Sequence, residues 1–303
     1  MKPIYLAVLL IIAIFSSCKQ NEVSTSATPE LQRLENEMKD VKKPELAQQY
    51  IKEITKVYPT QEGYNDKINL LKKGLDISEQ YNFNADANYF LAELCKYDTL
   101  RSDRADYIYR LATRLKTIGK TTPADVLFYG FTQKFSDNPN LNSANVLMTN
   151  DITQIDTFLL KLAAKVFENP DQEGINRKNA LNYVDACEAY ALVYKNDQAA
   201  NYLYKASEIS RTIQTYPKTI ALYDWILRDY PNNTHAPTAL FLKGYILDDD
   251  FNDVDKARQC YQEFLDKYPD NDFADDVKFL MENLGKSDEE IFQIIEKNNP
   301  STK

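Results

Sequence analysis

Few side chains in this chain of 303 residues could carry acid–base or metal chemistry at neutral pH. The chain has one histidine, His235, which follows Pro231 in a turn-like stretch. A His-based catalytic triad needs a base placed by partners, and a His-rich metal site needs more than one imidazole. No phosphate-binding loop, dinucleotide fingerprint, nucleophile elbow or C-x-x-C pair occurs in the sequence. We therefore interpret His235 as a residue at the start of a helix, and we expect no cofactor.

An acidic run that begins at Asp248 is the second place where chemistry could occur. Asp248, Asp250 and Asn252 have the spacing of the first three ligands of an EF-hand calcium loop. The sixth position is Asp253, where that loop needs glycine, and the twelfth is Gln259, where it needs glutamate. We interpret the run as a solvated loop that caps the following helix, and we expect no metal site.

Cys18 is the cysteine whose surroundings indicate a chemical role. An apolar run over residues 4–15 follows Lys2 and is too short to span a bilayer, but it is typical of a signal peptide. The run ends in Phe15-Ser16-Ser17-Cys18, which resembles the lipobox of bacterial lipoproteins. That resemblance implies cleavage before Cys18 and acylation of its thiol. An ordinary signal peptide with an incidental cysteine is the alternative.

The residues after Cys18 indicate where the protein is located, and the net charge limits the kinds of partner it can bind. Lys19 stands where an aspartate would resemble an inner-membrane retention signal, which favours the outer membrane. Glu22 is the only acidic residue among residues 19–22, so the periplasmic and surface faces both stay open. The net charge of −9 argues against nucleic-acid binding and against adsorption to anionic lipid headgroups. We expect membrane attachment through the N-terminal lipid alone.

The composition favours a helical protein without a disulfide framework. Only 7 glycines occur in 303 residues, whereas sheet proteins and phosphate-binding folds need glycine at tight turns. The 21 tyrosines mostly stand at helical spacing among Ala and Leu, which indicates packing between helices. Cys95, Cys187 and Cys260 are odd in number and lie in apolar helical patterns, so we predict buried free thiols.

A repeat of 38 residues near the C-terminus predicts how the helices are arranged. The pair Tyr230-Pro231 recurs as Tyr268-Pro269 at this spacing. Repeats of this length build stacked helical hairpins, because a single hairpin cannot bury its apolar face alone. The other aligned pairs are Tyr223 with Tyr261, Ile226 with Phe264, Leu227 with Leu265, Ala236 with Ala274, Ala239 with Val277, Phe241 with Phe279, and Leu242 with Leu280.

Apolar residues at helical spacing predict further helices along most of the chain. Residues 136–142, 169–174 and 247–253 are predicted loops, and Gly285 is a predicted helix stop. A capping box predicts a last helix from Ser287 to Glu296. The other predicted helices span residues 30–40, 44–57, 65–81, 85–96, 101–118, 122–135, 151–167, 179–194, 198–213, 219–230, 235–247, 255–268 and 273–284.

The segment from Ala257 to Pro269 resembles the second helix of a tetratricopeptide (TPR) repeat. It has a small residue, Ala257, where the two helices of that family cross, and an aromatic residue, Tyr261, four positions later. One repeat earlier, Thr219 stands in place of the alanine of the family. The resemblance implies an all-α fold, an α-solenoid of stacked TPR-like helical hairpins. The expected divisions are 1–17 signal peptide, 18–30 tether, 31–197 divergent hairpins, 198–285 TPR repeats, and 286–303 capping helix and tail.

TPR proteins bind peptides or proteins on a concave face built mainly from first helices, and the resemblance carries that function over as an expectation. A TPR lipoprotein whose helices end in Tyr-Pro resembles two groups of envelope proteins. One is the TPR lipoprotein of the outer-membrane β-barrel assembly machine, and the other is the TPR coordinator associated with the Tol-Pal system. We therefore expect a membrane-anchored scaffold for protein–protein interactions in cell-envelope assembly or maintenance. The candidate groove residues are Tyr204, Glu208, Arg211, Phe241, Tyr245, Asp248 and Phe279.

Two other functions remain open at the level of the sequence. A glycan- or nutrient-binding lipoprotein is the alternative, although such proteins stack sugars on exposed tryptophan. The single tryptophan, Trp225, stands inside a repeat helix, where we predict a core position. A hydrolase on a helical solenoid is the third hypothesis, but no pair of carboxylates is singled out by its spacing.

Overall fold

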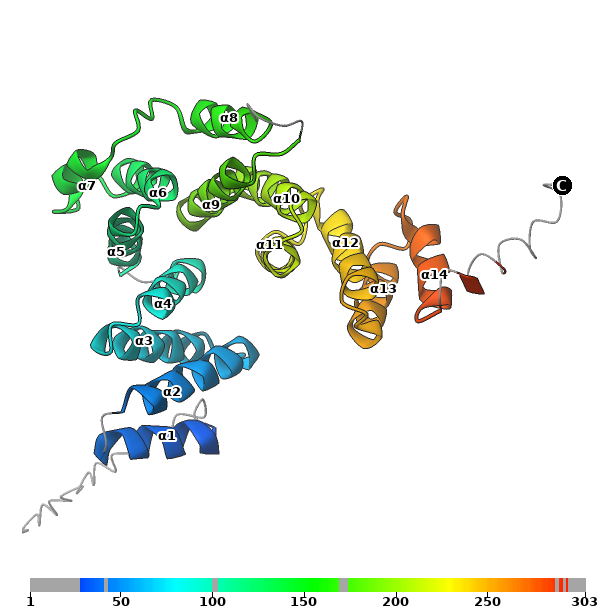
Figure 1. Cartoon of the computed structure of the whole chain (residues 1–303), viewed down its shortest axis with the longest axis horizontal. Helices are drawn as coiled ribbons and strands as arrows, with labels where there is room; N and C mark the ends of the chain where they lie inside the picture. Colours follow the sequence, from blue (N-terminus) through cyan, green and yellow to red (C-terminus); the bar gives the residue numbers. More distant parts are fainter. Residues whose placement is uncertain are drawn as a thin grey trace, which may run out of the picture. The chain divides into compact units, whose positions relative to one another are not determined.

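The computed structural model describes residues 28–40, 43–99, 103–168 and 174–286, with residues 289, 290 and 293. These residues form helices and turns and contain no strand (Figure 1). The predicted all-α fold class is therefore confirmed. Three predicted features lie outside the described residues: the signal peptide, lipidation at Cys18, and nearly all of the last helix.

The helices agree with the predicted ranges to within a few residues at most ends. The single described 3-10 turn, η1 (Tyr58–Thr60), follows the second helix. The α-helices are α1 (Pro29–Asp40), α2 (Pro44–Val57), α3 (Tyr64–Gln80), α4 (Asn84–Tyr97), α5 (Arg104–Thr117), α6 (Thr121–Lys134), α7 (Leu141–Leu147), α8 (Ile155–Lys165), α9 (Arg177–Val193), α10 (Asp197–Thr212), α11 (Tyr216–Asp229), α12 (Ala236–Asp249), α13 (Val254–Lys267) and α14 (Ala274–Asn283).

Local sequence accounts for most of these boundaries. The side chains of Asn176, Asn196 and Asp253 accept backbone N–H groups at the starts of α9, α10 and α13, which are the caps such residues favour. The cap at Asp253 confirms that the acidic run caps the following helix. Gly285 follows α14 with φ of +77°, a left-handed conformation that only glycine adopts without strain.

Two predicted boundaries were wrong. Residues 136–142 are predicted as a loop and no helix is predicted for residues 143–150, but the short helix α7 lies across these two stretches. Residues 247–249, predicted as loop, belong to the last turn of α12. In both cases a helix includes polar residues whose neighbours, rather than their own propensity, decide the backbone conformation.

The chain divides into two compact units, residues Met1–Gly74 and Leu75–Lys303. In the first unit α1 packs on α2, and its core includes Leu31, Leu34 and Ile54, each at most 1% exposed. The boundary falls inside α3. This boundary is not the predicted division between residues 197 and 198. That division marks where the TPR-like repeats are expected to begin, and it stays a prediction.

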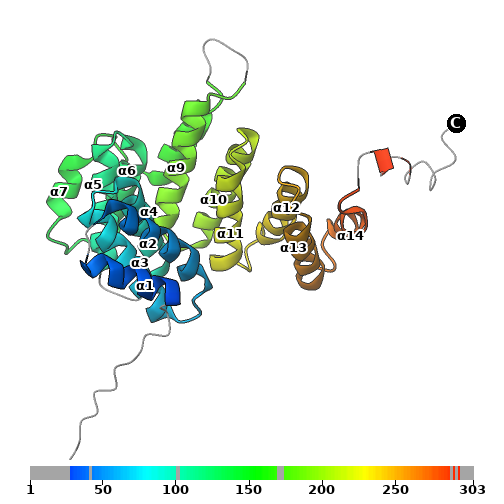
Figure 2. The same ribbon diagram turned by 60° about the horizontal axis from the view of Figure 1, so that its bottom comes forward.

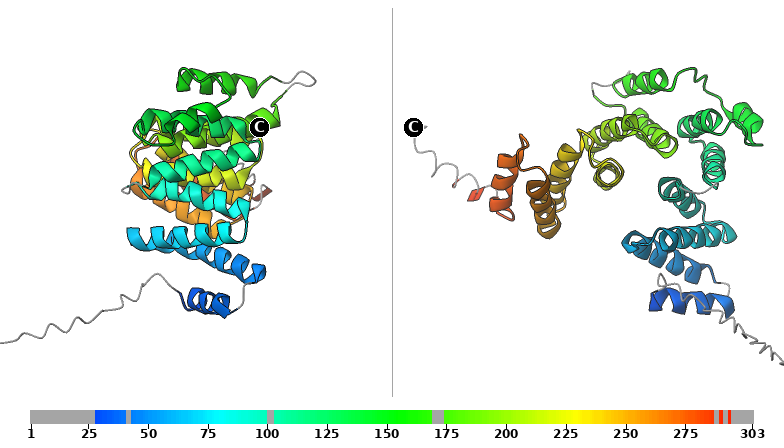
Figure 3. Two further views of the ribbon diagram at one scale, coloured as in Figure 1. Left: turned by 90° about the vertical axis from the view of Figure 1, so that its left-hand side faces the viewer. Right: turned by 180° about the vertical axis from the view of Figure 1, so that it is seen from behind.

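In the second unit each long helix packs against the next one along the chain, from α4 through α6 and from α9 through α14 (Figure 2). The series continues directly from α6 to α9 because these two helices pack on each other. The intervening α7 and α8 lie beside the series, on α6 and α9 respectively (Figure 3). Sequentially adjacent packing of this kind is the architecture of an α-solenoid-like repeat.

The C-terminal repeat has the interior that its sequence predicts. Ala257 and Tyr261 are fully buried, and α12 and α13 approach each other closely at Gly244. A Cβ atom added at Gly244 would lie 2.7 Å from the ring of Tyr261. One repeat earlier Thr219 is also fully buried, and its hydroxyl donates to the Ser210 hydroxyl at 3.0 Å. The buried Thr219 hydroxyl is therefore satisfied by a hydrogen bond at this position.

No helix among the described residues combines the length and the apolar character that crossing a membrane requires.

Candidate functional site

The outward face of α10 carries the first predicted groove residues. Ala199, Leu203 and Ala206 are fully buried and hold this helix between α9 and α11. Tyr204, Glu208 and Arg211 therefore lie on the opposite side, because residues four and seven positions apart share one face of a helix. The packing of α10 thus presents one aromatic ring and two opposite charges to solvent in a row.

The first turn of α12 meets this row at Tyr204. Its ring stacks on the imidazole of His235, with the two centroids 4.0 Å apart and the planes 5° from parallel. Burial lowers the pKa of His235, while the carboxylate of Glu208 opposes that shift and Lys205 adds to it. The predicted position of His235 at a helix start is confirmed, since it is the N-cap residue of α12.

Arg211 connects the two helices electrostatically. Burial raises the pKa of Tyr204 and of Tyr245, and the guanidinium of Arg211 counteracts both shifts. Tyr245 on α12 is 39% exposed, and Asp248 follows one turn later on the same helix. Burial and the neighbouring Asp249 raise the pKa of Asp248. We define the α10–α12 row as Tyr204, Glu208, Arg211, Tyr245 and Asp248.

The other two predicted groove residues are not part of this row. Phe241 stacks on Phe273 at a centroid distance of 4.8 Å and packs edge-on against Phe264 at 6.3 Å. It therefore packs against the core of α12, α13 and α14. Phe279 is 39% exposed on α14, which lies one hairpin further along the chain.

Three charged residues of α10 have no ion-pair partner among the described residues, unlike one lysine on each of the next two helices. Lys205, Glu208 and Arg211 on α10 form no ion pair with any residue that the structure describes. By contrast, Lys218 on α11 lies 2.9 Å from Glu188, and Lys243 on α12 lies 2.7 Å from the carboxylate of Asp224. The charged groups of α10 are thus free to contact a ligand without breaking an existing pair.

A pocket of about 410 Å³ opens beside the row, between α8, α9 and α10. We call it the α8 pocket. It shares Lys205 and Glu208 with the surface of α10. The hydroxyl of Tyr202 donates to Asp156 Oδ1 at 2.6 Å inside it, and Lys205 Nζ lies 5.6 Å from the Tyr202 ring centroid. Its other lining residues include Leu160, Phe167, Tyr183 and Ile209.

The sequence analysis did not identify the α8 pocket, although the sequence of α8 contains a signal for it. Leu159, Leu162 and Val166 form one apolar face of α8 and are buried. Leu160 directly follows Leu159, and Phe167 directly follows Val166. These two residues are 70% and 66% exposed. A helix with two apolar faces needs two neighbours, but the described helix against which α8 mainly packs is α9.

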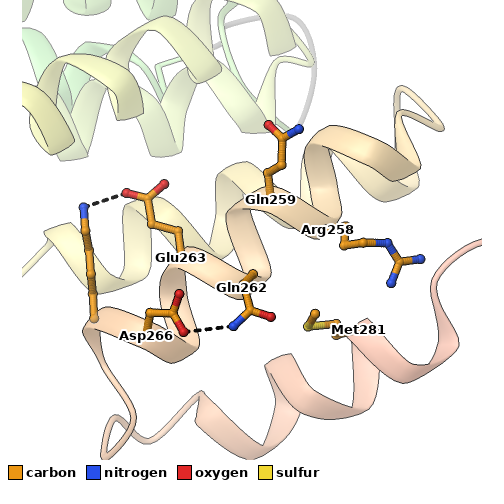
Figure 4. A pocket seen from close by; sticks show the side chains of 7 residues that line it. Arg258, Gln259, Gln262, Glu263, Asp266 and Met281 are labelled. Atoms are coloured by element: carbon orange, nitrogen blue, oxygen red, sulfur yellow. Dashed lines mark hydrogen bonds and ion pairs between the residues drawn. The ribbon is translucent and has the colours of Figure 1, made fainter.

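A larger depression of about 520 Å³ lies over α13 and α14 (Figure 4). Its polar side chains pair with one another: Gln262 Nε2 donates to Asp266 Oδ1 at 2.9 Å, and Lys267 Nζ to Glu263 Oε1 at 2.6 Å. Met281 supplies its apolar wall from α14. Exposed pairs four residues apart are ordinary features of a helix surface, so this depression offers no convergent set of groups to a ligand.

The single tryptophan lies in a cluster of charged side chains from distant helices. Trp225 is 2% exposed, with Lys96 Nζ 4.6 Å and Lys195 Nζ 5.8 Å from its ring centroid. Its indole N–H donates to Asp229 Oδ2 at 2.8 Å, and Arg228 Nε donates to Asp229 Oδ1 at 2.6 Å. The predicted core position of Trp225 is confirmed, and its covered ring offers no face to a sugar.

The thiols and carboxylates of the described residues form no reactive or metal-binding group. Cys95, Cys187 and Cys260 are free and buried, as predicted. Burial raises the pKa of Cys95 and of Cys187 to about 12, which keeps both thiols protonated at neutral pH. Among the described residues, no three His, Cys, Asp or Glu side chains come together in a way that could hold a metal ion.

No model of a known protein family matches the chain, and no curated protein sequence is significantly similar to it. The resemblance of residues 257–269 to a TPR helix therefore stays a prediction.

Proposed function

We propose that this chain is a lipid-anchored scaffold of the bacterial outer membrane that binds a segment of another envelope protein along the α10–α12 row. The observation that supports this most directly is that five predicted groove residues from two helices form one surface. Tyr204 of α10 stacks on His235 at the start of α12, with the two ring centroids 4.0 Å apart. Side chains of this kind, held by packed helices, bind a segment without first having to be ordered.

The chemistry of the row suits a protein segment. Tyr204 and Tyr245 offer large, rigid surfaces that lose little conformational entropy on binding. Glu208 and Arg211 offer one acceptor and one donor group between them, and neither has an ion-pair partner among the described residues. The combination of apolar area with separated charges can set both the affinity and the register of an extended segment.

The binding part of the proposal is tested by photo-cross-linking in cells. A benzophenone amino acid replaces Tyr245, and in a matched control it replaces Tyr89 on α4, which is 38% exposed. We expect one major protein adduct from the Tyr245 position and none from the control position. Equal adducts from both positions would contradict a specific surface at the row.

The identity of the adduct tests the place of the scaffold in the envelope. Mass spectrometry of the Tyr245 adduct would be expected to identify a component of the β-barrel assembly machine or of the Tol-Pal system. Recovery of a nutrient transporter instead would favour the glycan- or nutrient-binding alternative.

The anchoring part of the proposal is tested separately with Cys18→Ser. Without the thiol no acyl chain can be attached, and each buried methylene of such a chain contributes about 0.8 kcal/mol to membrane binding. We expect the variant to appear in the soluble fraction and to lose the mass of the lipid. Unchanged membrane retention of Cys18→Ser would contradict lipid anchoring while leaving the α10–α12 row untouched.

A further inference from the structure

We infer that the α8 pocket receives one large apolar side chain of the bound segment, and that basic residues beside this side chain contact the acidic groups of the α10–α12 row. The inference rests on the proposed function and specifies the partner: a segment with an aromatic or long aliphatic anchor next to Lys or Arg. Three properties of the molecule support it: the apolar surface of the pocket, the continuity of the two sites and their charge.

The apolar surface of the pocket is the first step. Leu160 on α8 and Phe167 in the turn after α8 are 70% and 66% exposed, and both line the pocket. Large apolar side chains that gather at the rim of a hollow mark a binding surface, because covering them removes an unfavourable contact with water. The volume of about 410 Å³ falls within the range of roughly 300–1,000 Å³ for sites that enclose a small ligand. One large side chain with part of its backbone fits this space.

The continuity of the pocket with the row is the second step. Glu208 belongs to both sites, and Lys205 lies between Tyr204 of the row and the Tyr202 wall of the pocket. Residues 204–211 of α10 rise by about 10 Å, at about 1.5 Å for each residue. An extended segment covers that distance with about three residues. A segment that contacts Arg211 and Tyr245 therefore reaches the pocket without leaving α10.

The charge of the combined surface is the third step. Asp156 and Glu208 line the pocket, and Asp248 lies at the far end of the row beside Asp249 and Asp250. Burial and Asp249 raise the pKa of Asp248, as expected where negative charge accumulates. Lys205 and Arg211 are the cations of this surface, which is therefore acidic overall. A basic segment is complementary to it, whereas an acidic one is repelled.

The same pocket is poorly suited to a sugar. Sugars bind to open aromatic faces, but Tyr183 and Tyr202 are 3% and 5% exposed and offer little ring surface. The carboxylate of Asp156 already accepts the Tyr202 hydroxyl. An apolar side chain needs no hydrogen bond and so fits the groups that remain.

The test uses three fluorescein-labelled synthetic peptides of about ten residues each, with affinities measured by fluorescence anisotropy on the purified chain. The basic Phe peptide alternates Lys and Gly around a central Phe, the basic Ala peptide has Ala at the centre, and the acidic Phe peptide has Glu in place of Lys. We expect the basic Phe peptide to bind at least about tenfold more tightly than either of the others. Equal affinities of the two basic peptides, or tighter binding of the acidic one, would overturn the inference.

Two variants test whether the preference for the Phe peptide depends on the α8 pocket. Leu160→Asp should remove the preference for the basic Phe peptide over the basic Ala peptide. Val146→Asp is the matched control, because Val146 on α7 is 82% exposed and lies outside the pocket. It should leave that preference unchanged, and both variants should keep the melting temperature of the parent chain. A preference that survives Leu160→Asp, or competition for the pocket by a soluble oligosaccharide, would overturn the inference.

A third variant separates failure of the inference from failure of the proposed function. Tyr245→Ser should weaken both basic peptides alike, because Tyr245 belongs to the row and not to the pocket. If the two basic peptides bind equally and Tyr245→Ser weakens both, the pocket inference fails and the row stands. If neither basic peptide binds, or Tyr245→Ser changes nothing, both fail.

Discussion

The hairpin of α12 and α13 and the cluster around Trp225 are held together by different physical means. In the hairpin, Gly244, Ala257 and Tyr261 pack without charge, and the closest approach joins α12 to the next helix, α13. In the cluster, Arg228 of α11 donates to the Tyr97 hydroxyl of α4 at 2.8 Å, across 131 residues of sequence. Repeated apolar contacts build the series of helices, whereas long charged side chains join helices far apart in it.

The cluster joins its helices through several such contacts. Lys195, in the turn after α9, donates to the backbone oxygen of Lys96 at 3.1 Å. Arg104 of α5 donates to the carbonyl of Leu192 at 2.7 Å, at the end of α9 where unpaired carbonyls favour a cation. Figure 1 shows α4 and α11 on the same side of α9. A linear repeat stack has contacts between neighbours only, so these bonds add cooperativity that the repeats alone lack.

The largest effect is expected from a charge placed in the apolar hairpin. Ala257→Arg introduces a long cation at a fully buried crossing point, where it has neither space nor a partner. We expect the free energy of unfolding to fall by about 4 kcal/mol or more. Gln259→Arg, on the exposed side of the same helix, is the control and should change it by less than about 0.5 kcal/mol. Equal denaturation midpoints for the two variants would show that Ala257 does not lie at the crossing point of the two helices.

The next largest effect is expected from a charge removed from the Trp225 cluster. Asp229→Ala leaves Arg228, Lys195 and the Trp225 indole N–H without their common acceptor. We expect a loss of about 3 kcal/mol of stability in urea denaturation, because one side of a partly buried charge network is removed. Asp224→Ala breaks an exposed pair with Lys243 and should cost less than about 1 kcal/mol. Similar losses from both variants would mean that the cluster is no more than a surface ion pair.

A methyl group added at the closest approach in the hairpin should have a smaller effect. Gly244→Ala places a Cβ atom 2.7 Å from the ring of Tyr261 and 3.2 Å from Cβ of Cys260. The helices must separate slightly, at a cost of about 1–3 kcal/mol that outweighs the helix propensity of alanine. Thermal unfolding followed by circular dichroism measures the change. A raised melting temperature would mean that α12 and α13 do not pack as closely as this.

The smallest effect concerns pH and compares one lysine from each region. Burial lowers the pKa of Lys195 to about 8, although Asp229 opposes this shift. Burial also acts to lower the pKa of Lys243, but Asp224 outweighs it and raises that pKa above the ordinary 10.5. Between pH 8 and 9 the unfolded chain keeps a proton that native Lys195 loses, so this residue makes stability rise with pH. The raised pKa of Lys243 affects stability only above 10.5 and has no effect in this window.

The two lysines are compared by replacing each with methionine. Relative to the parent chain, Lys195→Met should lose a pH-dependent stability increase of at most about 1 kcal/mol between pH 8 and 9. Lys243→Met should show the same pH slope as the parent chain in urea denaturation. A changed slope in Lys243→Met, or none in Lys195→Met, would contradict the contrast between the two regions.

Helical periodicity could predict only part of the geometry of the candidate groove residues. The positions of Tyr204, Glu208 and Arg211 on one face of α10 follow from their spacing, and α10 begins within one residue of its predicted start. Phe241 was placed on the groove face of its helix by the same kind of spacing, but it packs against Phe264 and Phe273. Periodicity assigns a residue to a face of its helix, but it does not say which neighbouring element covers that face.

The amino-acid sequence by itself determined the helical class, most helix ends and the apolar contacts of the C-terminal repeat, because these depend on residues close together in the chain. The tertiary structure decided which exposed positions lie side by side. It brought Tyr204 against His235, opened the α8 pocket beside α10, and joined Tyr97 to Arg228. Contacts of this kind depend on how successive helices turn relative to one another, and small crossing angles summed over many helices leave no periodic signal in the sequence.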